Sequence, residues 1–191
     1  GNPVLPFTEG LPYQIVNLLF DGEMEEGQIY DFLIAGLTDC EGNVFADSIQ
    51  VGLPQAIEAG DVLINEVLFN PFTGGADFVE VANVSAKVLN ISDLQLGELF
   101  PGTDSVFNLD LVSEIGQLML PGELLCLTTD VSIQQATYLP PSTANFFEMT
   151  GFPSYDDARG EIALLDLTET VIDRFAYEDD YHFPSLIDDN G

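Results

Sequence analysis

Basic side chains are almost absent from this chain. Its 191 residues include three Lys or Arg against 33 Asp or Glu, and the formal net charge at pH 7 is -30. Nucleic acids present dense rows of phosphates, which proteins neutralise with many basic side chains. Lys87, Arg159 and Arg174 are too few for that task, and the same shortage disfavours anionic membrane surfaces. The composition therefore excludes nucleic acid as a partner.

Histidine, cysteine and tryptophan are also scarce. The single histidine, His182, excludes any site that needs two imidazoles, including the zinc patterns built on histidine pairs. Cys40 and Cys126 form no CxxC motif and lie in separate β-rich blocks, so we expect free thiols. Tryptophan is absent, which weakens the case for sugar binding on aromatic platforms. The tyrosines that could serve as platforms instead are Tyr138, Tyr155, Tyr177 and Tyr181, although turn and core roles are more common for tyrosine.

Long apolar runs and targeting signals are missing too. The chain has no run of about 18 apolar residues, so we expect no membrane insertion. Its first residues lack the basic region and apolar region of a secretion signal. Hydrophobic residues nevertheless make up 46% of the chain, which is enough apolar surface to offset the entropy of ordering it. We therefore expect a globular and strongly acidic protein.

The first 53 residues form the first of two β-rich blocks. Strands are predicted at 13–20, 28–37 and 48–53, and the turn at 39–43 contains Gly and Asn, which tolerate positive φ. Three strands are too few to make a stable sandwich alone. We interpret residues 54–60, with one Pro and one Gly between two β-rich blocks, as an interdomain linker.

Residues 61–191 form the second block, in which short β-type runs alternate with turns. This density of short strands is typical of an antiparallel β-sandwich. One short helix is predicted at 130–138, with Asp130 or Thr129 as its N-cap. The predicted strands are 61–69, 78–83, 88–91, 94–97, 106–111, 117–120, 124–128, 162–167 and 171–177. The predicted fold class is all-β.

Several motifs of the second block resemble a lamin-tail domain, and they are closer to its bacterial branch than to nuclear lamins. They read DVLINEVLFNP at 61–71, DFVEVAN at 77–83 and LPGE at 120–123, followed by IALLD, VID and a late loop, DDYHFP. The resemblance implies an Ig-like antiparallel sandwich of about nine strands, cut short at its C-terminal edge. The residues that carry the family signature are Asn65, Glu66, Asn70, Pro71, Glu80, Asn83, Pro121, Gly122 and Asp173.

The first block resembles the end of a bacterial Ig-like domain. The similarity lies in GQIYDFLIAGLTDCEGN at 27–43, which covers only the last strands of such a domain. The resemblance implies a fragment of a longer multidomain protein. A partial Ig-like unit leaves an open strand edge, and open edges invite pairing with another chain. We therefore expect a homodimer that forms through residues 13–52.

Carboxylates within the predicted strands are the candidate catalytic groups. Glycoside hydrolysis needs two acids, one as general acid and one as nucleophile or base, and Glu66, Glu80 or Asp173 could supply them. The alternative is that these acids point out of the core. We expect Asn65 and Asn83 to satisfy buried backbone groups. The lamin-tail resemblance implies no catalytic role for its signature, and we predict that the chain is not an enzyme.

The loop that contains His182 offers no support for a Ser-His-Asp site, because no serine lies in a GxSxG elbow. We expect residues 181–183 to plug one end of the sandwich. The surrounding acids should make the His182 imidazole hold its proton more readily.

Clustered acidic turns make calcium the strongest cofactor hypothesis, because Ca²⁺ prefers several oxygen ligands. The principal candidate ligands are Asp156, Asp157, Asp179 and Asp180, and further acidic turns lie at 39–43 and 188–190. None of them matches the EF-hand loop. The alternative is that these turns are simply solvated.

These patterns together predict a non-catalytic interaction or spacer module of a larger bacterial protein. The resemblance implies an exported protein, placed outside the cell, on its surface or in the periplasm. Its expected partners are other proteins or neighbouring domains of the same polypeptide. Two alternatives remain open: a calcium-dependent adhesion or carbohydrate-binding module, and a hydrolase that uses strand carboxylates.

Overall fold

A computed structural model describes residues 22–39, 41–100, 102–140 and 145–179. In these ranges the regular secondary structure consists of β-strands, one α-helix and one 3-10 turn, η1 (Ile91–Asp93). The helix is α1 (Val131–Tyr138). The strands are β1 (Ile29–Thr38), β2 (Val44–Gly52), β3 (Val62–Leu68), β4 (Phe78–Asn83), β5 (Leu89–Asn90), β6 (Leu94–Leu99), β7 (Val106–Leu111), β8 (Leu118–Met119), β9 (Leu124–Thr128), β10 (Phe146–Glu148), β11 (Arg159–Asp166) and β12 (Val171–Glu178).

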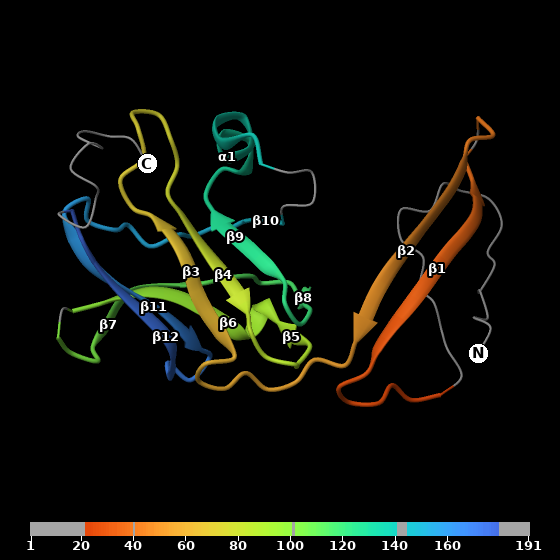
Figure 1. Cartoon of the computed structure of the whole chain (residues 1–191), viewed down its shortest axis with the longest axis horizontal. Coiled ribbons are helices and arrows are strands. Elements are labelled where there is room, and N and C mark those ends of the chain that lie inside the picture. Colours follow the sequence, from red (N-terminus) through yellow and green to blue (C-terminus); the bar gives the residue numbers. More distant parts are fainter. Residues whose placement is uncertain (1–21, 40, 101, 141–144, 180–191) are drawn as a thin grey trace.

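Two four-stranded sheets form a sandwich, beside which the hairpin β1–β2 stands apart (Figure 1). One sheet has the strand order β10-β9-β4-β3 and the other has the order β12-β11-β6-β7. Their pairings are antiparallel except between β10 and β9. The all-β sandwich prediction is therefore confirmed, and this architecture is compatible with Ig-like domains.

Strand alternation explains the core between the sheets. On β4, Val79 and Val81 are buried, whereas the intervening Glu80 lies on the outer face. Ile162 and Leu164 of β11 face them from the other sheet, and both are fully buried. Because successive side chains of a strand point to opposite faces, one apolar face per sheet fills the interior.

The sandwich is closed on one side where the edge strands β3 and β12 meet. The backbone amide of Gly60 donates to the carbonyl of Ile172 at 3.1 Å. The amide of Ile64 donates to Oδ2 of Asp173 at 2.7 Å. A bulge interrupts the β3–β4 register between Ile64 and Glu66, so Asn65 has no partner in the β4 ladder. The Asp173 carboxylate therefore takes the place of a backbone acceptor beside a bulge.

The hairpin has one face that is apolar apart from Asp47. Its register shifts between Ala35 and Leu37, and Gly36, with φ of 76°, supplies the bulge that puts Leu37 opposite Phe45. At the turn, Oδ1 of Asp39 accepts from the amides of Glu41 and Asn43, each at 2.9 Å. The register and alternation put these side chains on one face, which we call the hairpin face: Tyr30, Phe32, Ile34, Leu37, Phe45, Asp47, Ile49 and Val51.

Residues 54–60 are attached to the sandwich. Lys87 Nζ lies 2.6 Å from a carboxylate oxygen of Glu58 and 2.7 Å from one of Asp61. The amide of Gln55 donates to the carbonyl of Val88 at 2.8 Å. The segment interpreted as a linker is thus held by hydrogen bonds and ion pairs.

The predicted element boundaries agree closely with the structure where it describes them. The helix begins after Asp130, whose Oδ1 accepts from the amide of Ile133 at 2.9 Å. Strand β2 begins at Val44, four residues before the predicted start at residue 48. Strand β10 was not predicted, because three residues are too few to show a period. The predicted strand at 13–20 lies outside the described residues.

Candidate functional site

Glu66 and Glu80 lie directly opposite each other on the outer face of β3 and β4. Glu66 is exposed and Glu80 is partly buried, and Nδ2 of Asn65 donates to Oε1 of Glu80 at 2.7 Å. Cys126 of β9 is the next residue across this face. Burial raises the pKa of the Cys126 thiol to about 12, and the negative charges of Glu80 and then of Glu66 contribute to this increase. The thiol is therefore protonated at neutral pH and is a poor nucleophile.

The two signature asparagines have different environments. Asn83 is 1% exposed, and its Nδ2 donates to the carbonyls of Lys87 and Met119 at 2.9 and 3.0 Å. Its Oδ1 accepts from the amide and the hydroxyl of Ser85. The prediction for Asn83 is confirmed. The prediction that Asn65 also satisfies buried backbone groups was wrong. The bulge turns this residue to the surface, where its side chain donates to the Glu80 carboxylate.

The other signature residues shape turns. Pro121 and Gly122 are the central residues of a tight turn in which the amide of Glu123 donates to the carbonyl of Leu120 at 3.1 Å. Gly122 has φ of 79°, which a type II turn requires at that position. After β3 the chain bends at Asn70, and Pro71 packs so closely on Gly75 that a Cβ there would lie 2.8 Å from the proline ring.

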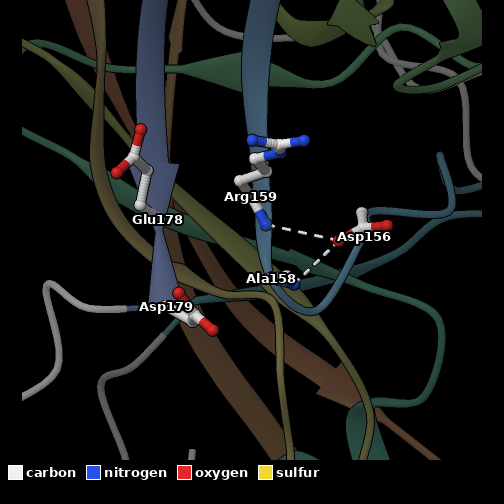
Figure 2. A pocket seen from close by; sticks show the side chains of 5 residues that line it. All are labelled: Asp156, Ala158, Arg159, Glu178 and Asp179. Atoms are coloured by element: carbon white, nitrogen blue, oxygen red, sulfur yellow. Dashed lines mark hydrogen bonds between the residues drawn. The ribbon is translucent and has the colours of Figure 1, made fainter.

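Two of the predicted calcium ligands, Asp156 and Asp179, line a groove of about 410 Å³ at the ends of β11 and β12 (Figure 2). Figure 2 shows Asp156 on one side, Glu178 and Asp179 on the other, and Arg159 between them. Oδ1 of Asp156 accepts from the amides of Ala158 at 2.8 Å and Arg159 at 3.3 Å. These bonds lower the pKa of Asp156. A guanidinium within the groove opposes the binding of a second cation there.

The remaining calcium candidates are not gathered with these two. Asp157 does not line the groove, and Asp180 lies outside the described residues. In the hairpin turn, the Asn43 side chain donates to Oδ2 of Asp39 at 2.8 Å and lowers its pKa. Within the described ranges, no group of three or more His, Cys, Asp or Glu side chains is arranged to hold a metal ion. The calcium hypothesis stays a prediction.

The loop at 149–158 covers one end of the sandwich, and we call it the end loop. It carries Met149 and Tyr155 into the core, where both are buried. The Tyr155 hydroxyl has no hydrogen-bond partner among the described residues. The ring of Tyr177 stacks on Phe69 with centroids 4.0 Å apart, and its hydroxyl donates to the carbonyl of Asp156 at 2.6 Å.

Acidic groups surround these two phenols. Burial, reinforced by Asp157, raises the pKa of Asp77 to about 6. Burial also raises the pKa of Glu98. The hydrogen bond from the Asn108 side chain lowers this pKa, and the negative charge of Asp156 raises it further. The four ion pairs among the described residues all involve Lys87 or Arg174, and none reaches Asp77 or Glu98.

Sequence reasoning missed this cluster. Glu98 alternates in phase with the buried Leu94 and Leu96 of β6, and this inward position was the available signal. Of the tyrosines considered as platforms, Tyr155 and Tyr177 are buried in the core and cannot serve as platforms, in line with the core role that is the more common alternative. Tyr138 is 44% exposed and packs edge-on against Phe78, while Tyr181 and the predicted plug at 181–183 lie outside the described residues.

No family model and no curated protein matches this chain. In the part of the chain that the structure describes, no helix is long and apolar enough to cross a membrane.

Proposed function

We propose that this chain is a non-catalytic interaction and spacer module of an exported or surface-attached bacterial multidomain protein. It combines a lamin-tail-type Ig-like sandwich with the last strands of a preceding Ig-like unit. Its partners are other proteins, neighbouring domains of the same polypeptide, or a second copy that pairs through the hairpin.

The positions of the signature residues support this proposal. Asp173 closes the edge between the sheets, Asn83 satisfies buried carbonyls, and Gly122 permits a tight turn. These are tasks of folding rather than of chemistry. Glu66 and Glu80 lie on an outer face of the sandwich, whereas a catalytic pair needs a concave site that both acids share with the substrate.

The exposed apolar residues of the hairpin face are the observation that carries the proposal. Leu37, Phe45 and Ile49 are 49%, 51% and 43% exposed. An isolated two-stranded hairpin is marginally stable in water, and contiguous exposed apolar residues mark interaction surfaces. A module that presents such a face is suited to pack against another β-structure.

Sedimentation equilibrium of the chain tests the proposal. We expect concentration-dependent self-association that the triple variant Leu37→Asn, Phe45→Thr, Ile49→Thr weakens by about tenfold or more, since buried apolar anchors dominate interfaces. The matched control replaces sandwich residues that are at least as exposed, Val84→Thr, Ile115→Asn and Leu167→Thr, and should associate like the wild type. A wild-type chain that stays monomeric while its hairpin amides resist hydrogen exchange contradicts the proposal.

A further inference from the structure

One carboxylate interrupts the apolar residues of the hairpin face. Asp47 of β2 lies directly opposite Ile34 of β1, and Phe45 and Ile49 are its neighbours on the same side of its own strand. Apolar side chains therefore flank it on three sides. Its Oδ1 accepts from the amide of Ser48 at 2.8 Å, and no ion pair in the described ranges involves it. Asp47 is exposed, so water solvates its carboxylate in the free chain.

A partner that covers the hairpin face removes this water. Leu37, Phe45 and Ile49 lose their exposed area when another surface packs on them, and Asp47 lies among the same side chains. A carboxylate that leaves water without gaining an opposite charge opposes association. A surface that fits the hairpin face must therefore combine apolar side chains with a basic side chain that reaches Asp47.

A second copy of this chain has no such basic group on its hairpin. The chain contains three basic residues, and none of them lies in β1 or β2. Lys87 and Arg174 already form ion pairs with acids of their own chain. Arg159 lines a groove together with three acids. Two hairpin faces packed together would thus bury two carboxylates and no basic group, in chains that each carry a net charge of -30.

We propose that the hairpin face binds a partner protein whose contact surface is apolar and carries a basic side chain opposite Asp47, and that it binds this partner more tightly than a second copy. The inference rests on the interaction function proposed above and names the chemistry of the partner. Apolar contacts supply most of the affinity. The ion pair with Asp47 distinguishes a basic surface from a neutral or acidic one.

A charge-reversed copy of the chain serves as the probe. Asp47→Lys presents the same apolar side chains and adds one basic group to them, so it imitates the proposed partner surface. Sedimentation velocity with fluorescence detection follows a trace of labelled wild-type chain during titration with unlabelled wild type or with Asp47→Lys. We expect binding to Asp47→Lys to be at least about tenfold tighter than wild-type self-association, because a charge-assisted bond replaces an unpaired carboxylate.

Three further variants make the comparison specific to this position. Glu114→Lys changes the net charge equally at an exposed position of the sandwich and should bind the wild type no more tightly than the wild type binds itself. Labelled Asp47→Asn keeps the shape of the side chain without its charge and should lose the preference for Asp47→Lys. Asp47→Arg is a second basic probe, which should behave like Asp47→Lys.

The outcomes separate this inference from the proposed function. Equal binding of the wild type to itself and to Asp47→Lys would overturn the inference but leave the interaction function standing. No binding to either chain would also overturn the inference. A labelled triple variant of the hairpin face that binds Asp47→Lys as tightly as the wild type does would overturn it as well, since the contact would then lie elsewhere. A wild type that is monomeric alone but binds Asp47→Lys would support the inference and exclude only the second copy.

Discussion

The sandwich and the hairpin are built from similar alternating strands, but they treat their apolar residues differently. Ile162 and Leu164 of the sandwich are 0% exposed, whereas Leu37, Phe45 and Ile49 of the hairpin are 43% to 51% exposed. A sheet buries its apolar face only when a second layer packs on it. The alternation of apolar residues along a strand therefore specifies which face of the sheet is apolar. Whether that face is buried depends on whether a second sheet packs against it.

Truncation of a leucine in each region should show the largest effect. Leu164→Ala opens a cavity in the core and should lower the free energy of unfolding by about 2–5 kcal/mol. The matched change in the hairpin, Leu33→Ala, affects a side chain that is 78% exposed. It should change the free energy of unfolding by no more than about 0.5 kcal/mol. Urea denaturation measures both. Equal losses would show that the hairpin is packed as tightly as the sandwich.

The sheet edge joined by Asp173 should show an intermediate effect. Asp173→Ala removes the acceptor of the Ile64 amide and should destabilise the sandwich by about 1–3 kcal/mol, because a partly buried donor loses its partner. Asp173→Asn keeps a side-chain oxygen that can accept this bond and should destabilise the sandwich less than Asp173→Ala. The hairpin has no such closure in the described residues, so its exchange rates should stay unchanged. Equal destabilisation by Ala and Asn would assign the effect to charge.

The connection between the two regions should show the smallest effect on the sandwich. Lys87→Met removes the ion pairs with Glu58 and Asp61, and hydrogen exchange at 54–60 should become faster while the melting temperature of the sandwich changes little. The bonds to Asp61 and then Glu58 raise the pKa of Lys87, so the stabilisation is fully present below the ordinary lysine pKa of 10.5 and is lost as the pH rises through the higher value of the folded state.

The control for the connection is Arg174→Met, which removes ion pairs with Glu161 and Asp104. It should leave exchange at 54–60 unchanged. High salt should reproduce part of the Lys87→Met effect in the wild type, because exposed ion pairs are screened. Exchange at 54–60 that responds equally to both variants would contradict a local role for Lys87.

Local signals predicted much of the fold. The ranges 78–83, 106–111 and 124–128 match β4, β7 and β9 residue for residue. Alternation and turn residues act over a few positions, so the sequence displays them directly. Strand β10 was not predicted, because its pairing with β9 joins residues about 20 positions apart in sequence. Such a pairing produces no alternation of apolar and polar residues that the local sequence would show.

The candidate sites were harder to predict, because their properties depend on neighbours that are distant in sequence. Asn65 and Asn83 looked alike as strand asparagines, yet a bulge exposes the first while the second lies at a buried turn. Asp156 and Asp179 were predicted as calcium ligands from their acidic surroundings. Only the folded structure shows Arg159 lining the same groove.

By itself the sequence determined the shortage of basic groups, the all-β fold class and the turns that divide its strands, because these properties are local or compositional. The tertiary structure alone decided which apolar faces are covered and which acids lose their water. Asp77 and Glu98 lie far apart in sequence, but the fold partly desolvates both and brings each within the electrostatic influence of an acid of the end loop. Desolvation and Coulomb interactions depend on distances in space, which the order of residues along the chain does not state.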